Sequence, residues 1–434
     1  MNTEKPLLKT EILAGISTFL ATFYIIIVNP AILSAAGMPF SGVLTATILV
    51  SCFGSLMMGL YAKNPIVVAP GMGINAFFTY TAVMGFGLTY QEALGAVFWS
   101  GVIFLVLSFF KTREKIIHAI PPAIRHAVSA GIGLFICFIG FQNAHFIVDN
   151  PATLVSMAPF KDPISLTFLA GLLLTGVLIS RKVSGAIIYG IIFTTALAWP
   201  IGRFWGDASA INFGVSTLVN FTGFFAWPDF SLVLQADILG SLKYAYLPVI
   251  FVFTFTILFD GISTFVGLAE ASGLKDPDGS PRNMRKSLMT DSLATLFAGL
   301  VGSSSGTAYI ESAVGIEEGG RTGATAVTAG LLFLPFLFFS PLLSVIPSVA
   351  SSIALVLVGS FMILPLTKIN WGKPDEAIPS FLTLVLIPFT YSLSIGISFG
   401  FLSWTVIKLL SGKKAEINPI LIIITVLSLL FLWL

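Results

Sequence analysis

Residues 69–75 read Ala-Pro-Gly-Met-Gly-Ile-Asn and residues 302–308 read Gly-Ser-Ser-Ser-Gly-Thr-Ala, and both stretches lie in apolar surroundings. Proline removes a backbone donor and glycine permits non-helical dihedral angles, so each stretch is expected to interrupt a helix. Irregular backbone at membrane depth persists only where protein or a water-filled cavity satisfies its polar groups. Interruptions at matching places in two halves of a chain therefore predict a binding site near the membrane midplane. Ordinary loops outside the membrane are the alternative for either stretch alone.

The composition around these stretches is that of a membrane protein. The chain has 434 residues, of which 56% are hydrophobic and 10% are charged, whereas soluble domains carry about 25% charged residues. Apolar runs such as 249–258 and 331–339 belong to segments near the roughly 20 residues that span a bilayer as a helix. The pattern is not the alternating short strands of an outer-membrane barrel. An all-helical polytopic membrane protein is expected, and the net charge of +2 indicates no nucleic-acid partner.

Apolar segments along the chain predict about fourteen membrane-spanning elements in two sets of seven. Because seven is odd, the second set enters the membrane from the opposite side, which is the arrangement of inverted repeats. A polar and aromatic loop at 206–243 separates the sets, and the short apolar stretch 420–434 is either a partial span or an interfacial helix. The expected segments are 11–36, 42–61, 70–84, 91–110, 123–145, 164–180, 185–202, 245–270, 285–301, 305–317, 322–340, 345–366, 378–393 and 394–410.

Lysine and arginine residues assign these segments to the two sides of the membrane. With a cytoplasmic N-terminus, about nineteen of the 22 Lys and Arg residues fall in cytoplasmic loops, and only Lys161, Arg203 and Lys243 lie outside. This asymmetry is the positive-inside bias of membrane proteins. We therefore expect a multi-pass protein of the cell inner (plasma) membrane that contacts lipid and has a cytoplasmic N-terminus.

Two carboxylates lie within the apolar segments. Asp260 is in the middle of the eighth segment, and Glu311 follows the second interruption. An acidic group at mid-bilayer costs roughly 3 kcal/mol on insertion scales, so it is expected to face a cavity or a partner and to be functional. The alternative for Asp260 is a structural hydrogen bond to a neighbouring helix, and for Glu311 it is a cap on the following helix.

The remaining polar residues give weaker signals. Asn75 offers a donor and an acceptor to a small ligand, or caps a helix. Four acids near the cytoplasmic end of the second half are interpreted as solvated loop charges; they are Glu270, Asp276, Asp278 and Asp291. The sequence has no Cys/His cluster, Walker loop or nucleophile motif, so we expect no metal, no cofactor, no catalytic residue and no ATP-driven pumping.

Four stretches, at 11–19, 28–33, 69–78 and 309–323, resemble a known transporter family. On these residues the chain, from about residue 8 to its C-terminus, is similar to the AzgA-like purine permeases of the nucleobase–ascorbate transporter superfamily. The resemblance implies the uracil-permease fold, with two inverted repeats of seven and two interrupted helices that each follow a short strand. It also implies a core domain at 11–110 and 245–340 and a gate domain at 123–202 and 345–434, with the loop 206–243 outside.

The same resemblance implies a homodimer that imports purine bases such as guanine, hypoxanthine and possibly adenine together with protons. In that family the acid of the eighth segment and the Glu of the tenth bind the base, and these are Asp260 and Glu311. The other binding residues expected are Asn75, Gly73, Ala76, Phe77, Tyr309 and Ile310. The sequence departs from the family pattern at Ile257 and Gly261, where relatives usually carry Asp and Thr, so the polar surroundings of the core acid are thinner here.

Purine chemistry explains why such residues are needed. Guanine presents N1–H beside an amine, and one carboxylate can accept both hydrogen bonds. Flat rings favour aromatic walls, for which the candidates are Phe23, Tyr24, Phe77, Phe259 and Tyr309. An apolar environment favours the neutral form of a carboxyl group, so Asp260 or Glu311 can carry the proton. Because a helix N-terminus favours an ionised carboxylate, we expect Glu311 to accept the base's N–H edge and Asp260 to change protonation.

Three alternatives remain at this stage. The chain could be an anion exchanger or channel of the same fold, although two acids at the site disfavour an anion. It could be a permease for another nucleobase, such as uracil or xanthine. An intramembrane enzyme would need a nucleophile with a base or a metal cluster, and the sequence indicates neither.

Overall fold

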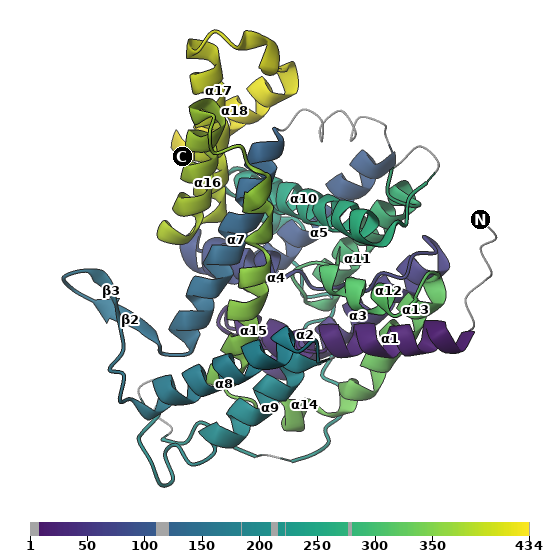
Figure 1. Cartoon of the computed structure of the whole chain (residues 1–434), viewed down its shortest axis with the longest axis vertical. Helices are drawn as coiled ribbons and strands as arrows, with labels where there is room; N and C mark the ends of the chain where they lie inside the picture. The colour runs from purple at the N-terminus through teal and green to yellow at the C-terminus, as the bar shows by residue number, and fades with distance from the viewer. Residues whose placement is uncertain are drawn as a thin grey trace.

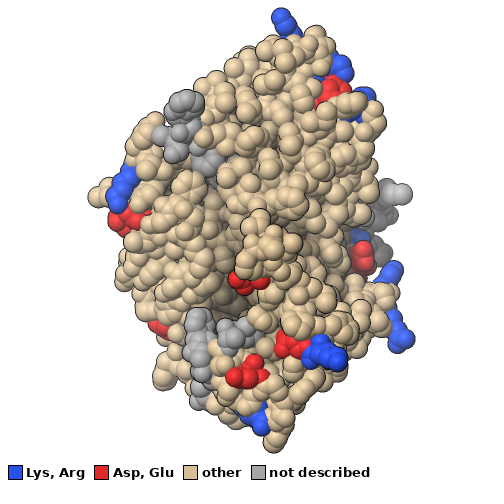
Figure 2. All heavy atoms as spheres, turned by 90° about the vertical axis from the view of Figure 1, so that its left-hand side faces the viewer, with Lys and Arg blue, Asp and Glu red and all other residues tan. Residues whose placement is uncertain are grey.

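Most of the chain folds into helices, and the computed structural model describes residues 8–109, 121–183, 185–209, 216–221, 223–276 and 280–433. Much of the surface in Figure 2 carries no charged side chain, as expected where protein meets lipid. Seven helical segments in these ranges are long and apolar enough to cross a membrane: Leu8–Ser34, Phe40–Leu60, Tyr90–Ser108, Pro122–Asn143, Pro163–Ser180, Tyr244–Ala269 and Ser348–Lys368. The fold is a mostly helical membrane fold, and the count of about fourteen spans stays a prediction.

One group of helices surrounds the two interruptions (Figure 1). In this group α3 packs against α2, α11 and α13, α5 packs against α10 and α11, and α1 packs against α12 and α13. The helices are α1 (Leu8–Thr22), α2 (Ile25–Ser34), α3 (Phe40–Leu60), α5 (Tyr90–Phe109), α10 (Leu247–Ser272), α11 (Met284–Val301), α12 (Ala313–Glu317) and α13 (Gly323–Phe333).

The remaining long helices pack mainly on one another. In this second group α7 contacts α15, α16 and α17, α8 and α9 contact α15, and α17 contacts α18. The helices are α7 (Pro122–Asn143), α8 (Pro163–Ser180), α9 (Ala186–Ala198), α15 (Ser348–Phe361), α16 (Pro374–Phe389), α17 (Leu393–Leu410) and α18 (Pro419–Trp433). The short α14 (Ser340–Leu343) precedes α15. A hairpin of β2 (Ile147–Asn150) and β3 (Leu154–Met157), which the sequence reading did not predict, follows α7.

The first expected segment is broken in the structure. α1 ends at Thr22 and α2 begins at Ile25, so Phe23 and Tyr24 form a turn between them. Pro30 lies inside α2, and proline has no N–H to donate while its ring clashes with the carbonyl four residues earlier. The third expected segment is also irregular, because the short α4 (Met72–Ala76) continues as a π-helix over Phe77–Gly85. π-helical turns are rare and often occur at functional sites.

The two predicted interruptions meet at the centre of the fold. β1 (Val68–Ala69) and β4 (Thr307–Ala308) precede them and pair antiparallel, with Val68 opposite Ala308 and Ala69 opposite Thr307. Each strand leads into a short helix, α4 after β1 and α12 after β4. Gly306 is needed beside this pair, since a Cβ there would lie 2.5 Å from the Cβ of Ala294 in α11. The strand pair therefore brings the starts of the two interrupted helices together.

Serine side chains satisfy the irregular backbone around the strands. The Gly71 N–H donates to Ser305 Oγ at 3.0 Å, and the Val67 N–H donates to Ser312 Oγ at 3.0 Å. Asn29 of α2 donates through Nδ2 to Ser303 Oγ at 3.2 Å. Buried backbone groups need such partners, because an unpaired donor in an apolar environment is costly.

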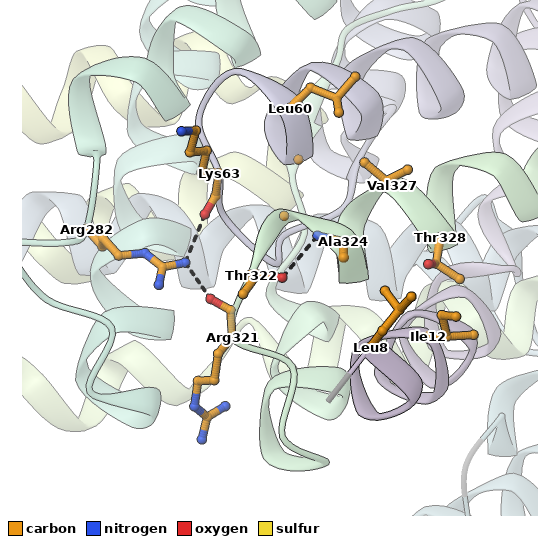
Figure 3. A pocket seen from close by; sticks show the side chains of 12 residues that line it. Leu8, Ile12, Leu60, Lys63, Arg282, Arg321, Thr322, Ala324, Val327 and Thr328 are labelled. Carbon is orange, nitrogen blue, oxygen red and sulfur yellow. Dashed lines mark hydrogen bonds between the residues drawn. The ribbon is translucent and has the colours of Figure 1, made fainter. Parts of the chain in front are cut away.

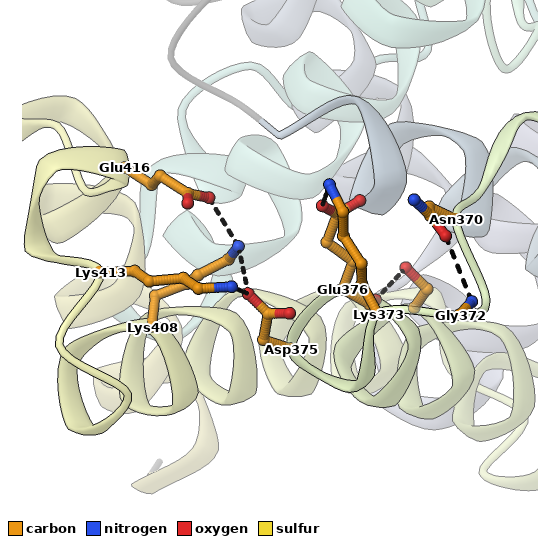
Figure 4. Close-up of polar contacts among 9 residues, drawn as sticks. Asn370, Gly372, Lys373, Asp375, Glu376, Lys408, Lys413 and Glu416 are labelled. Atoms are coloured by element: carbon orange, nitrogen blue, oxygen red, sulfur yellow. Dashed lines mark hydrogen bonds and ion pairs between the residues drawn. The ribbon is translucent and has the colours of Figure 1, made fainter.

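A buried lysine connects the C-terminal helices (Figure 4). Lys408 of α17 has a side chain that is 1% exposed, and its Nζ lies 2.7 Å from Asp375 Oδ2 in α16 and 2.6 Å from Glu416 Oε2. Lys413 Nζ also lies 2.6 Å from Asp375 Oδ2. A charge removed from water needs such partners to offset its desolvation. These ion pairs join α16, α17 and the turn before α18.

Candidate substrate-binding site

Glu311 lies in a helical turn, Ile310–Ser312, between β4 and α12. Its carboxylate is partly exposed, and Tyr24, from the turn between α1 and α2, donates its hydroxyl to Glu311 Oε1 at 2.6 Å. Tyr24 itself is 1% exposed. A hydroxyl donating to a carboxylate at this distance is a strong, charge-assisted hydrogen bond. The structure thus presents Glu311 as an acceptor that a second chain segment holds in place.

Asp260 lies in α10, an unbroken helix that faces the strand pair. Its carboxylate is also partly exposed, and Oδ2 accepts a hydrogen bond from Thr307 Oγ1 of β4 at 3.4 Å, which is near the limit for a hydrogen bond. Gly71 makes this approach possible, because a Cβ there would lie 2.9 Å from Thr307 Oγ1 and 3.5 Å from Asp260 Oδ2. Asp260 therefore has weaker protein partners than Glu311.

The electrostatics of this region are acidic. Asp260 and Glu311 lie close enough for their charges to interact, and neither forms an ion pair with any Lys or Arg among the described residues. Two carboxylates without cations form a poor site for an anion. They suit a ligand that offers N–H donors.

Four predicted residues of the first interrupted helix are buried away from these carboxylates. Asn75 is 0% exposed, and its Oδ1 accepts a hydrogen bond from Ser304 Oγ, so its amide joins the two interruptions and does not cap α4. Gly73 backs onto Ile132 of α7, where a Cβ would lie 2.5 Å from Cγ2. Ala76 is 1% exposed, and Phe77 is 0% exposed with its ring 4.7 Å from that of Phe253.

The predicted residues of the second interrupted helix lie beside Glu311. Tyr309 is 5% exposed, its N–H donates to the Val67 carbonyl at 2.9 Å, and its hydroxyl donates to the Pro70 carbonyl. Ile310 is 46% exposed. Tyr309 therefore links the two interruptions, while Ile310 and Glu311 present accessible surface.

The aromatic candidates separate into different roles. Phe23 packs against Phe336, with ring centres 4.7 Å apart, in a cluster that also includes Phe19. Tyr24 reaches Glu311 through its hydroxyl, although the sequence suggested only a wall. The side chain of Phe259 lies outside the described part of the structure.

Asp291 corrects a sequence interpretation. It was expected to be a solvated loop charge, but it lies inside α11 and is 0% exposed. Its Oδ2 accepts from the Ala308 N–H of β4 at 3.3 Å, and its Oδ1 has no hydrogen-bond partner among the described residues. Gly261 leaves room for it, since a Cβ there would lie 2.7 Å from Asp291 Oδ2. Asp291 is thus a third carboxyl group near the paired strands, and its hydrogen bond with Ala308 stabilises β4.

The other three acids of that group differ. Asp276 lies in the loop after α10 as expected, and its Oδ2 accepts from the Asn283 N–H at 3.0 Å. Asp278 and the side chain of Glu270 lie outside the described residues. The residues before Asp291, which include Arg285 and Lys286, did not indicate that it is buried. Its buried partner is in β4, which is distant in the sequence.

A cavity of about 590 Å³ lies elsewhere, between α1, α3 and α13 (Figure 3). It is lined by apolar side chains such as Leu8, Leu60 and Val327, and none of the predicted binding residues contributes to it. At one end, Arg282 donates to the carbonyls of Lys63 at 3.0 Å and Arg321 at 2.8 Å. The candidate site stays the pair Asp260 and Glu311, which have no cation partner among the described residues, and its position remains a prediction.

Comparison with known proteins supports a transport role. The permease family Xan_ur_permease matches residues 9–427. The chain is 39% identical to the adenine permease AdeP of Escherichia coli strain K12, covering 97% of this chain and 92% of that protein. It is also 39% identical to the guanine/hypoxanthine permease PbuO of Bacillus subtilis strain 168, covering 97% of this chain and 96% of that protein.

Solved structures with the same fold have little sequence in common with this chain. The transmembrane domain of the cyanobacterial bicarbonate transporter BicA aligns with a TM-score of 0.65 at 15% identity, covering 92% of this chain and 98% of that domain. SLC26A9 aligns with a TM-score of 0.65 at 12% identity, covering 94% of this chain and 66% of that protein. With a membrane fold, two buried interruptions and near full-length relatives that are permeases, the chain belongs to the Xan_ur_permease family and is a membrane transporter, not an enzyme.

Proposed function

We propose that the chain imports purine bases, namely guanine and hypoxanthine, with adenine as a further candidate, by proton symport. The observation that carries this proposal is the pair of partly exposed acidic residues, Asp260 and Glu311, beside the paired strands and without a cation partner in the described chain. Purines present N–H donors that carboxylates accept. Relatives named as adenine and guanine/hypoxanthine permeases support the substrate class.

The two acids take different roles. Glu311 already accepts a hydrogen bond from Tyr24 at 2.6 Å, which favours its ionised, accepting form. It therefore binds the N–H edge of the base. Asp260 has one long contact, to Thr307 at 3.4 Å, and lies among apolar neighbours such as Leu258. It is the group that takes up a proton with the base and releases it on the other side.

The surrounding residues shape the site. Tyr309 and Ile310 border Glu311, while Asn75, Gly73, Ala76 and Phe77 hold the first interrupted helix against its neighbours. In this proposal fourteen segments form two inverted repeats of seven. The helices around the strand pair move as a core against a gate formed by 123–202 and 345–434. The protein works as a homodimer in the inner membrane with its N-terminus in the cytoplasm.

Anion exchange is the competing function, because BicA is titled a bicarbonate transporter and has the same fold. The acidic site disfavours it, as a bound anion would lie beside two carboxylates with no cation among the described residues. Uptake of radiolabelled purines, uracil and bicarbonate by cells that lack their own permeases for these substrates separates the functions. Saturable purine uptake that excess bicarbonate leaves unchanged supports the proposal, and bicarbonate uptake without purine uptake contradicts it.

A further inference from the structure

The hydrogen bond between Tyr24 and Glu311 joins residues that lie far apart in the sequence. The Tyr24 hydroxyl donates to Oε1 of Glu311 at 2.6 Å. Because hydrogen bonds to charged groups are stronger than neutral ones, a ligand does not displace this hydroxyl easily. The carboxylate also accepts from the backbone N–H of Glu311, and Tyr24 is the one side chain among the described residues that is seen to donate to it. The two oxygens of one carboxylate are therefore not equivalent toward a ligand.

The Tyr24 hydroxyl is also held in place by its own segment. The Tyr24 ring is 1% exposed, and its carbonyl accepts from the Ile27 N–H at 3.1 Å and the Val28 N–H at 2.9 Å. These bonds fix the turn between α1 and α2 from which the side chain extends. Moving the hydroxyl away from Glu311 would leave a buried phenol without its acceptor, which is unfavourable.

The number of Glu311 carboxylate oxygens that are free to accept determines which purine edge binds more tightly. Guanine offers N1–H and its 2-amino group side by side, and a carboxylate with two free oxygens accepts both. Hypoxanthine offers N1–H alone. If Oε1 is occupied by Tyr24, the second donor of guanine must share that oxygen with the phenol. The 2-amino group then adds little to binding.

We propose that Tyr24 is a specificity-determining residue, which occupies Glu311 Oε1 and so makes the site accept guanine and hypoxanthine about equally. This inference rests on the proposed function, because it requires Glu311 to accept the N1–H of a purine. Tyr24 acts through Glu311 and does not itself need to touch the base.

The test compares apparent affinities for guanine and hypoxanthine, measured by competition with radiolabelled hypoxanthine in the full-length protein. In the wild type we expect the two affinities to agree within about tenfold, which is less than a full hydrogen bond to a charged group contributes. In Tyr24→Phe the released oxygen accepts the 2-amino group, so guanine should gain about tenfold relative to hypoxanthine. Tyr80→Phe is the matched control, since the Tyr80 ring packs on Tyr391, and it should leave the ratio unchanged.

Several outcomes overturn the inference. A wild-type preference for guanine above about 100-fold shows that both oxygens already bind the base, and this measurement stands even if Tyr24→Phe fails to fold. An equal loss for both bases in Tyr24→Phe shows a purely structural residue, and a relative loss for guanine shows that the phenol oxygen itself accepts the amine. If the wild type binds neither base, the proposed function fails; if it binds both and the ratio does not respond to Tyr24→Phe, only the role of Tyr24 fails.

Discussion

Replacing Glu311 with glutamine tests the recognition of the base at a single atom. Glutamine keeps the size of the side chain but exchanges a pair of acceptors for one acceptor and one donor. In the wild type, Oε1 accepts from Tyr24 at 2.6 Å and Oε2 is available to the base. If the amide oxygen stays with Tyr24, the amide N–H₂ meets the N–H of the base. If the amide turns over, the buried Tyr24 hydroxyl, which is 1% exposed, loses its acceptor.

In the first orientation two donors meet at the base. In the second, the phenol oxygen can accept from the amide, but the buried phenol O–H loses its acceptor. Both orientations remove a charge-assisted hydrogen bond. Either outcome costs roughly 2–4 kcal/mol, or about 30- to 1000-fold in affinity. Competition against radiolabelled hypoxanthine in membranes measures it, with surface expression checked in parallel. Glu317→Gln is the matched control, because Glu317 lies in α12, the short helix that directly follows the turn of Glu311, but is exposed, and it should bind as the wild type does. Affinity within about threefold of wild type in Glu311→Gln would refute the assigned role.

Four further predictions concern coupling, stability, pH dependence and topology. Asp260→Asn should bind purines measurably and exchange them across the membrane but fail to accumulate them, because a neutral amide resembles the protonated acid; loss of binding in Asp260→Asn together with normal binding in Glu311→Gln would show that the two roles are reversed. Lys408→Met should lower the melting temperature by several degrees, since it leaves a carboxylate network without its buried cation; an unchanged melting temperature in detergent would count against this. Lys408 and Lys413 hold the pKa of Asp375 below its ordinary value. Their pairing with Asp375 therefore stabilises the protein above about pH 4, and this stabilisation is lost as pH falls through the lowered folded-state pKa. Melting temperatures measured across this pH range test the prediction. In a cysteine-free background, a cysteine at Lys63 should react only from the cytoplasm and one at Asp229 only from outside, and labelling of position 229 from the cytoplasm would rule out the inverted-repeat arrangement.

The sequence predicted the parts of the fold that local chemistry determines. Pro70 and Gly71, with Gly302 and Gly306, indicated where two helices are interrupted, because these residue types disfavour a helix wherever they stand. The position of Asp260 inside an apolar segment indicated a functional acid on grounds of cost alone. The hairpin at 147–157 was not predicted from the sequence, because only apolar helical spans were expected there.

The parts of the fold and of the candidate site that depend on contacts between distant segments were harder to predict from the sequence. Asp291 was interpreted as a surface charge because Arg285 and Lys286 precede it. In the structure it is buried, and the Ala308 N–H of β4 donates to its carboxylate. The contact of Asn75 with a ligand stays a prediction, and the sequence did not indicate that Ser304 Oγ donates to its Oδ1. Partners such as these are set by how the two halves pack, and local patterns do not encode that packing.

The central claim is that this transporter moves purines with protons, and transport by the purified protein in liposomes tests it most directly. Radiolabelled hypoxanthine uptake is measured with an imposed pH gradient, acidic outside, and separately with a sodium gradient at constant pH. We expect accumulation above equilibrium with the pH gradient, its loss when a protonophore is added, and no accumulation with sodium alone. Accumulation driven by sodium at constant pH, or purine uptake that does not respond to either gradient, would show that proton symport of purines is wrong.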